Sequence, residues 1–277
     1  MPNRGLKTLM VIVIFALTSF VCHAQDVSTI LMNGTYEIMG PTPRPGVVTY
    51  GPVFFMGKPL KADPTKGQFI LITAAHVLNE IAGDFATIIY RKNGPDGTYT
   101  KQPTAVNIRV NGVNLYKTHP DADVAVMYLP VPIALEPVIL PTNMLVDDKE
   151  LESIDIHPGD ELMCLGFPLS ADENTFPIIR SGLLASYPIT PTKIVKTFYY
   201  NFHIYPGNSG GPVFFSYTNR TVHGATMLGS TYQGVIGLVS QQANSTLPET
   251  QGTPLDISII VPGSFIREAI ALLPETP

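Results

Sequence analysis

One serine of this chain stands in a stretch that could carry nucleophilic chemistry. Ser209 lies in the segment YPGNSGGPVF, residues 205–214, among three glycines and an asparagine, with a proline on either side. A β-rich core has no use for so much backbone freedom, but a loop that points its amides at a substrate does. A serine hydroxyl is a weak nucleophile near neutral pH, so it needs a nearby base and a third group that orients the base. A histidine and a buried acid are therefore the partners to expect.

His76 is the candidate base. It lies in LITAAHVLNE, where an apolar and β-branched run ends in two alanines and a short helical pattern follows. The small alanines let the ring lie against a second element at the end of the strand. Alone, such a histidine is more often a structural residue than a base. His119, His157 and His223 lie in polar, turn-like segments, and we expect them to be exposed to solvent.

Asp123 is the candidate acid. In HPDADVAVMYL it directly precedes the predicted strand VAVMYL, so the strand can carry it into the interior. Asp121 lies two residues further out and is expected to turn the chain. A buried carboxylate needs a partner, because an unpaired buried charge is costly. The Nδ1–H group of His76 would be that partner. Taken alone, an aspartate that caps a turn is an equally good interpretation of Asp123.

Three short motifs together resemble the trypsin-like, chymotrypsin-fold serine proteases. They are TAAH (73–76), DVAV (123–126) and GNSGGP (207–212), and they follow that family's order of His, Asp and Ser. PGNSGGP, LGFP, SGLLAS and the ending ISIIVPGSFIREAIALL are similar to the bacterial high-temperature-requirement proteases in particular. The resemblance covers residues 46–273. It implies an all-β fold of two six-stranded antiparallel β-barrels that meet at a cleft, with a C-terminal helix.

The resemblance implies a role for each motif residue. Ser209 would attack the substrate carbonyl, His76 would take its proton and pass it to the leaving amine, and Asp123 would orient His76. The backbone N–H groups of Gly207 and Ser209 would form the oxyanion hole. The neutral Asn208 replaces the aspartate that pairs with a new N-terminus in many digestive relatives. We therefore expect activity without any cut beyond signal removal.

The same resemblance implies a substrate-binding strand and a specificity pocket. GLVSQQ (237–242) matches the strand that pairs with the substrate backbone, so Ser240, Gln241 and Gln242 are expected to line the cleft. The base of the pocket falls near His203, where relatives that cut after Lys or Arg carry an acid. Cleavage after Lys or Arg is therefore not expected. Ile204 and Ile236 favour a small or medium apolar side chain. His203 has two other interpretations: it accepts an acidic side chain, or it is a strand residue that faces solvent.

Several elements must position these residues. Many short apolar, β-branched runs separated by Gly, Pro, Asn and Asp favour an all-β sandwich or barrels over alternating βα units. We predict a signal peptide over 1–24, an N-terminal barrel over 25–130, a connection over 131–160, and a C-terminal barrel with its helix over 161–277. Ser264 is predicted to cap this helix, and Phe265, Ile266, Ala269, Ile270 and Leu273 to share its buried face. Because the protease-like motifs run into this C-terminal helix, we do not expect the peptide-binding PDZ module of the high-temperature-requirement family.

The N-terminus and the composition limit the location and the partners of the protein. Arg4 and Lys7 precede an apolar run that ends in small residues at Cys22 and Ala24, which is typical of a cleaved secretory signal. We therefore expect a secreted or periplasmic protein that is not membrane-bound after signal removal. The net charge of −5 and the lack of a basic stripe argue against nucleic acid as a partner. Cys164, in an apolar run, is predicted to be a small buried hydrophobe.

These features predict an exported serine endopeptidase that acts on polypeptides through an acyl-enzyme. A non-catalytic relative that binds a peptide or protein in the same cleft is the alternative from another class, and an esterase with the same triad stays open. No metal or cofactor is expected, since the sequence has no HExxH motif and no cysteine cluster. Calcium at the acidic segment VDDKELESIDI is a weaker interpretation than a solvated loop. The sequence does not indicate an oligomeric state.

Overall fold

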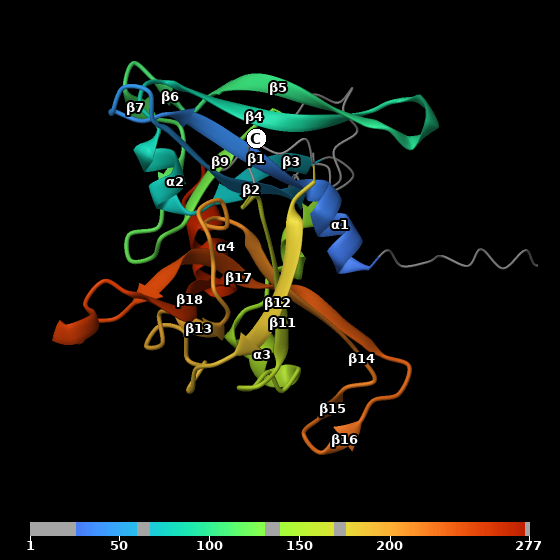
Figure 1. Cartoon of the computed structure of the whole chain (residues 1–277). Helices are drawn as coiled ribbons and strands as arrows, with labels where there is room; N and C mark the ends of the chain where they lie inside the picture. Colours follow the sequence, from blue (N-terminus) through green and yellow to red (C-terminus); the bar gives the residue numbers. More distant parts are fainter. Residues whose placement is uncertain (1–25, 60–66, 131–138, 169–175, 275–277) are drawn as a thin grey trace, which may run out of the picture.

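The computed structural model describes residues 26–59, 67–130, 139–168 and 176–274 (Figure 1). The predicted signal peptide, residues 1–24, lies outside these ranges. Within the described ranges, no helix combines the length and the apolar character needed to cross a bilayer. The protein is mostly β-structure, with four α-helices and three short 3-10 helices in its described part. These helices are α1 (Val27–Gly34), α2 (Ala75–Glu80), α3 (Asp148–Ser153), α4 (Gly263–Ala271), η1 (Pro95–Gly97), η3 (Thr142–Met144) and η4 (Pro248–Thr250).

The first half of the chain forms an open, mostly antiparallel sheet. Its eight strands follow the order β5-β4-β1-β2-β3-β9-β8, and β10 pairs with β2 in parallel. A separate two-stranded hairpin joins β6 and β7. These strands are β1 (Thr35–Pro41), β2 (Val48–Pro59), β3 (Gly67–Thr73), β4 (Phe85–Asn93), β5 (Tyr99–Asn107), β6 (Arg109–Val110), β7 (Val113–Asn114), β8 (Lys117–Thr118), β9 (Ala125–Tyr128) and β10 (Leu140–Pro141). Alternate residues of β4 are buried, which is the period of a strand with one face on the core.

The second half forms a closed six-stranded antiparallel barrel in the order β11-β12-β13-β18-β17-β14. A short hairpin, β15–β16, extends from it. The strands are β11 (Glu161–Gly166), β12 (Ile178–Leu184), β13 (Phe198–Asn201), β14 (Pro212–Thr218), β15 (Thr221–Val222), β16 (Ala225–Thr226), β17 (Thr231–Asn244) and β18 (Pro254–Pro262). Phe198, Tyr200, Phe214 and Phe215 are among its fully buried side chains. This barrel agrees with the prediction for the second half of the chain.

The prediction of a second closed barrel is wrong for the first half, because the two edge strands of the sheet do not pair. Closing a sheet requires two edges with matching free backbone groups. Here one edge, β8, has only two residues, and the other edge, β5, is mostly exposed. The residues between these edges form the β6–β7 hairpin, whose turn places Asn111 and Gly112 at positive φ. The intervening chain therefore pairs with itself and leaves the sheet open.

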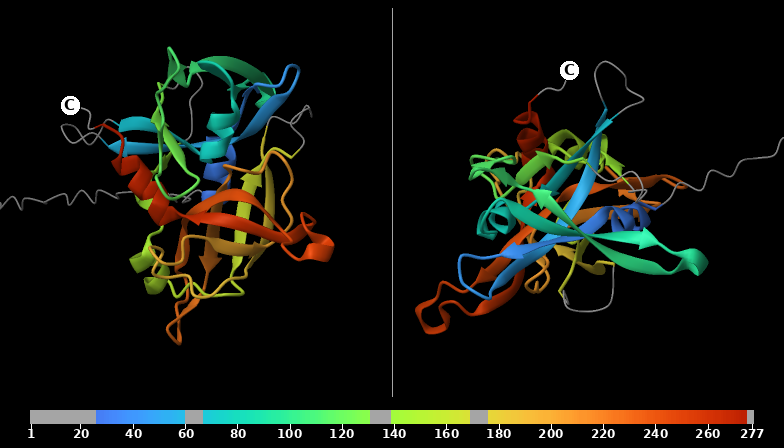
Figure 2. Two further views of the ribbon diagram at one scale, coloured as in Figure 1. Left: turned by 90° about the vertical axis from the view of Figure 1, so that its left-hand side faces the viewer. Right: turned by 90° about the horizontal axis from the view of Figure 1, so that it is seen from above.

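Helix α4 holds the two halves together. The predicted face is buried, with Phe265, Ile266, Ala269, Ile270 and Leu273 at most 7% exposed. The helix packs against β9 of the sheet and β17 of the barrel (Figure 2), and its side chains belong to the same hydrophobic core as the sheet. The predicted cap is wrong: Pro262 precedes the helix, and the hydroxyl of Ser264 donates instead to Thr192 Oγ1 at 2.8 Å.

The acidic segment in the predicted connection forms a capped helix, not a solvated loop. Asp147 and Glu150 make a reciprocal capping box at the start of α3, which satisfies backbone amides that the helix leaves unpaired. Arg267 of α4 pairs with both carboxylates, at 2.6 and 2.7 Å. The carboxylate of Asp148 accepts hydrogen bonds from the backbone amide and the hydroxyl of Thr192. Protein groups therefore already occupy the carboxylates that the calcium interpretation requires.

Candidate active site

The Ser209 loop joins β13 to β14 and leaves two amides free. Two tight turns shape it, in which Asn208 N donates to Tyr205 O and Gly211 N donates to Asn208 O. The amide of Gly210 donates to Val239 O on β17 at 2.7 Å. Among the described residues, the amides of Gly207 and Ser209 have no acceptor. Two unpaired donors beside a serine hydroxyl are the arrangement that stabilises an oxyanion.

Glycine is required at two positions of this loop. Gly207 has a φ of 93°, and a Cβ atom there would lie 2.2 Å from Phe167 O. Gly210 has a φ of 96°, and its Cβ would lie 2.2 Å from the hydroxyl oxygen of Thr73. Thr73 ends β3, in the same motif as His76, and donates to Pro52 O. The loop therefore packs closely on the segment that carries the histidine.

His76 and Asp123 lie as a hydrogen-bonded pair. His76 is the second residue of α2, directly after β3, and Asp123 lies just before β9. Strands β3 and β9 are neighbours in the sheet, so their ends bring the two residues together. His76 Nδ1 lies 2.7 Å from Asp123 Oδ2, and the backbone amide of His76 donates to Asp123 Oδ1 at 3.0 Å. The predicted partnership of the two residues is confirmed, and two contacts fix the orientation of the imidazole.

Ser240 contributes a third contact to Asp123, this time from the barrel. Its hydroxyl donates to Asp123 Oδ2 at 2.7 Å. Burial would raise the pKa of the Asp123 carboxyl, but the hydrogen bonds and the charge of His76, with the Ser240 hydroxyl, hold this pKa below its ordinary value. The Asp123 carboxylate is thus kept ionised. The hydrogen bond from Ser240, which joins the barrel to the sheet, contributes to this effect. The sequence places Ser240 on the cleft strand but does not indicate this contact.

The pKa of His76 is raised above its ordinary value. Burial alone would lower it, because burial disfavours the imidazolium. The hydrogen bond and the negative charge of Asp123 outweigh this effect, and the charge of Glu80 adds to them. Glu80 is a site residue beyond those predicted from the motifs; it follows His76 by four residues on the same short helix, a spacing that places the two side chains on one face.

One cavity of about 640 Å³ brings the candidate residues together. Its lining comes from both halves and consists of His76, Glu80, Asp123, Ile204, Tyr205, Pro206, Ser209, Ser240, Gln241 and Gln242. Ser209 and His76 therefore open onto the same space. In the described part of the chain, the Ser209 hydroxyl makes no hydrogen bond. Catalytic hydrogen bonds are often long in a free enzyme and shorten when substrate binds.

The predicted substrate-binding residues divide into two groups. Ile204, Ser240, Gln241 and Gln242 line the cavity. His203 does not line it: its Nδ1 lies 3.0 Å from Asp256 Oδ1, and its ring meets Tyr205 edge-on. Ile236 is fully buried in the barrel core and does not reach the cavity either. His203 lies two residues beyond the end of β13 and its side chain is 33% exposed, so the interpretation as a strand residue that faces solvent fits the structure better than a place at the base of a pocket.

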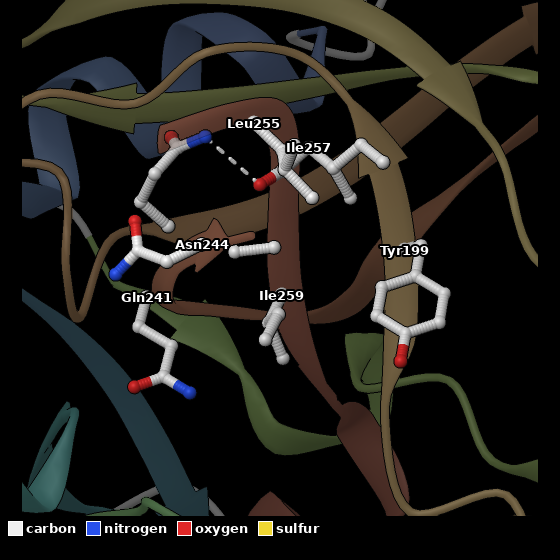
Figure 3. Close-up of a pocket in the computed structure, with 8 residues that line it drawn as sticks. Tyr199, Gln241, Asn244, Leu255, Ile257 and Ile259 are labelled. Carbon is white, nitrogen blue, oxygen red and sulfur yellow. Dashed lines mark hydrogen bonds between the residues drawn. The ribbon is translucent and has the colours of Figure 1, made fainter. Parts of the chain in front are cut away.

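Gln242 lines both this cavity and a second one. Its Oε1 accepts from the backbone amide of Ile204 at 2.8 Å, and its Nε2 donates to Ile257 O at 3.0 Å. The second bond is the dashed line in Figure 3. Beyond it lies a cavity of about 470 Å³ between β13, β17 and β18, whose apolar lining includes Tyr199, Leu255, Ile257 and Ile259. The Gln242 side chain thus connects Ile204, which lines the first cavity, to Ile257, which lines the second, and we call this bridge the Gln242 wall.

The remaining predicted residues have clear structural places. His157 and His223 are exposed, as predicted. The prediction for His119 is wrong, because this residue is 8% exposed; its ring packs edge-on against Phe265 and its Nε2 lies 3.0 Å from Glu268 Oε2. Cys164 is 1% exposed, and burial raises the pKa of its thiol to about 12. It is the small buried hydrophobe that the sequence predicts.

Asn208 directly precedes Ser209 in the chain. Its side chain is 1% exposed, and within the described ranges neither its amide nitrogen nor its carbonyl oxygen has a hydrogen-bond partner.

The described ranges contain no group of three or more His, Cys, Asp or Glu side chains arranged to hold a metal ion.

Comparison with known proteins places the chain in a family. A family model described as a trypsin-like peptidase domain matches residues 62–222, more than half of the chain, and this span includes His76, Asp123 and Ser209. The chain therefore belongs to the trypsin-like peptidase domain family.

Among solved structures, one that resembles this chain is the crystal structure of the serine endoprotease from Yersinia pestis. The match has 14% sequence identity and a TM-score of 0.48, and it covers 88% of this chain and 64% of that one. The chain thus spans less than two thirds of the length of that protein. A search of curated protein sequences finds no match.

Proposed function

We propose that the protein is a serine endopeptidase in which Ser209, His76 and Asp123 act as the catalytic triad. One observation carries this proposal: the imidazole of His76, oriented by Asp123, opens onto the same cavity as Ser209, beside two amides without acceptors. Membership of the trypsin-like peptidase family supports it.

The proposed mechanism uses these groups in order. With Nδ1–H held by Asp123, the Nε2 atom of His76 has a free lone pair and takes the proton as the Ser209 hydroxyl attacks the substrate carbonyl. The Gly207 and Ser209 amides donate to the oxyanion that forms. The imidazolium then gives its proton to the leaving amine, which leaves an acyl-enzyme. Water, activated by the same imidazole, hydrolyses the ester and restores the serine.

The substrate would bind along β17. Ser240, Gln241 and Gln242 lie at the cavity, where an extended peptide can pair with the strand by β-augmentation. The side chain before the scissile bond would lie against Ile204 and the Gln242 wall, which favours a small apolar residue. Neither Ile204 nor Gln242 is acidic, so we do not expect cleavage after Lys or Arg. Asp256 beside His203 disfavours an acidic residue there.

The proposal includes export and maturation. A chain cleaved after Ala24 would be secreted or periplasmic and would need no further cut, since the neutral Asn208 cannot form an ion pair with a new N-terminus. The two proposed units, 25–130 and 161–277, would then act together with the connection 131–160. Terminal sequencing of the exported form tests this: an active protein that begins at Gln25 is expected, and a protein inactive until trimmed further would contradict it.

A peptide-library cleavage profile tests the proposed activity. Purified chain and the Ser209→Ala variant are incubated with a diverse library, and new termini are identified by mass spectrometry. We expect cleavage by the first protein only, with small or medium apolar residues before the cut. Equal cleavage by both would assign the activity to another group or a contaminant. Ser209-independent binding of peptides by a folded, unreactive chain would favour the non-catalytic relative.

A further inference from the structure

A third cavity lies on the other side of the Tyr205–Pro206 segment from β17. It measures about 450 Å³ and shares Tyr205 and Pro206 with the candidate active site. Its other walls come from β2 of the sheet, from Pro168 just after β11, and from β12 of the barrel. The full lining is Tyr50, Pro168, Ile178, Arg180, Tyr205 and Pro206. Rings and aliphatic groups dominate this lining, and Arg180 is its one charged member.

Arg180 is held in place by rings and not by an acid. Its guanidinium carbon lies 4.1 Å from the ring centre of Phe202 and 5.1 Å from that of Tyr205. The side chain is partly buried, and within the described ranges it has neither an ion pair nor a hydrogen bond. Arg220 and Arg267 differ, since each pairs with carboxylates at 2.6 to 2.9 Å. The guanidinium N–H groups of Arg180 are therefore held in one orientation and have no acceptor among the described residues.

A guanidinium in such a place suits a carboxylate ligand. It is always charged, and its planar fork of N–H groups matches the two oxygens of a carboxylate. Stacking on two rings holds the fork still, so little entropy is lost when an anion binds. The apolar walls can contact the CH₂ groups of an aspartate or glutamate side chain. None of the lining residues carries a negative charge that would compete.

The position of the cavity relates it to one half of a substrate. If the acyl half pairs with β17, the chain beyond the scissile bond leaves the serine on the opposite side of Gly207. That side holds the Arg180 cavity, where Tyr50 lies against Gly207: a Cβ at Gly207 would be 2.8 Å from the Tyr50 ring. Building on the proposed function, we propose that this cavity binds an acidic side chain of the polypeptide substrate, C-terminal to the bond that is cut.

Matched peptides test this inference through cleavage. In a peptide cut by the enzyme, each position after the scissile bond carries either glutamate or its neutral isostere glutamine, and kcat/KM is measured for each pair. We expect a preference for glutamate of about tenfold at one of these positions. Arg180→Gln should bring this ratio of kcat/KM values close to one. Arg180→Lys should retain part of the preference, because it keeps the charge but not the fork.

Arg44→Gln is the matched control, because it removes the same charge from an exposed position outside the cavity. It should keep the full preference for glutamate. A preference lost equally in Arg44→Gln and Arg180→Gln would reflect net charge and would overturn the inference. Equal rates for glutamate and glutamine at every position in the unaltered enzyme would overturn it as well.

A binding experiment separates failure of this inference from failure of the proposed function. The Ser209→Ala variant cannot use the serine, and its affinity for fluorescein-labelled peptides with one glutamate moved position by position is followed by anisotropy. Tighter binding of a glutamate peptide than of its glutamine partner, lost on adding Arg180→Gln, supports the cavity even if the chain cleaves nothing. Identical affinities for every pair would overturn the inference, even in a chain that proves to be an active protease.

Discussion

At the scale of single residues, the central feature is a carboxylate shared by two partners. Asp123 accepts from the backbone amide and the ring of His76 and from the hydroxyl of Ser240. These contacts hold the imidazole in one tautomer and one orientation, which a general base requires. The raised pKa of His76 follows from the same contacts, with a contribution from Glu80.

The first prediction concerns pH. Catalysis requires the neutral imidazole, so kcat/KM should fall as the pH drops through the pKa of His76, which lies above its ordinary value of 6.5. Glu80→Gln removes a negative charge that favours the imidazolium, so this pKa should decrease and the acid limb should move to lower pH. The measurement is the pH profile of kcat/KM, with Glu152→Gln on the exposed surface of α3 as control. An acid limb that moves to higher pH, or equally in both variants, would contradict this account.

The second prediction concerns the wall formed by Gln242. Gln242→Ala removes both hydrogen bonds of the side chain and joins the catalytic cavity to the apolar cavity in Figure 3. The ratio of kcat/KM for phenylalanine over alanine before the scissile bond should rise roughly tenfold. Gln241→Ala is the matched control, because Gln241 lines both cavities but bridges nothing. A ratio that stays the same in both variants would show that Gln242 does not limit the pocket.

At the scale of elements, the Ser209 loop depends on close contact with the end of β3. Gly210→Ala would force a Cβ into Thr73 and Pro52 at a backbone conformation that side chains avoid. It should lower the free energy of unfolding by about 3 kcal/mol or more. Gly229→Ala has the same kind of backbone conformation but open space around it, and should cost only about 1 kcal/mol. Urea unfolding of both variants checks this, and similar losses would contradict the packing argument.

The sequence predicts some of these elements well and others poorly. Positions at the ends of apolar runs make His76 and Asp123 candidates, but their joint role and the six-stranded barrel follow from the resemblance of the three motifs. Hydrophobic patterning predicts the many short strands and the buried face of α4. The open sheet could not be foreseen, because local patterning does not reveal that β5 and β8 fail to meet. The sequence does not predict the Ser240–Asp123 hydrogen bond or the Gln242 wall, because each depends on how distant strands pair. The prediction that His119 is exposed is wrong because its neighbours in sequence are polar, whereas the fold packs its ring against Phe265 of α4.

At the scale of the whole molecule, the candidate site exists only where the two halves meet. His76 and Asp123 come from the sheet, whereas Ser209 and Ser240 come from the barrel, and α4 packs on both. Loss of docking between the halves would separate His76 from Ser209, because the two halves share one hydrophobic core around α4. Activity should therefore respond to anything that loosens the shared core around α4.

The global stability should depend on one buried acid in the sheet. Burial raises the pKa of Glu37 on β1 to about 7, above its ordinary value of 4.5, although the charge of Lys101 opposes this. Between these values the folded state binds a proton that the unfolded state lacks, so stability should fall as the pH rises, by about 3 kcal/mol in all.

Glu37→Gln should remove the part of this decline that Glu37 contributes. The free energy of unfolding, measured by denaturant titration at pH 5 and pH 8, should drop between the two values in the unaltered protein and in the control Glu152→Gln. In Glu37→Gln the drop should be smaller by up to about 3 kcal/mol. An identical pH dependence of the unfolding free energy in all three proteins would show that the pKa of Glu37 is not raised in the folded state.

The most direct test of the central claim is labelling with a fluorophosphonate, which reacts with a serine only when a neighbouring base activates it. The account predicts one label per chain, located on Ser209 by mass spectrometry. The label should be lost in Ser209→Ala and in His76→Ala but retained in Ser153→Ala, a control at an exposed serine. A folded protein that takes no label, or labelling of Ser209 that persists in His76→Ala, would contradict the proposed triad.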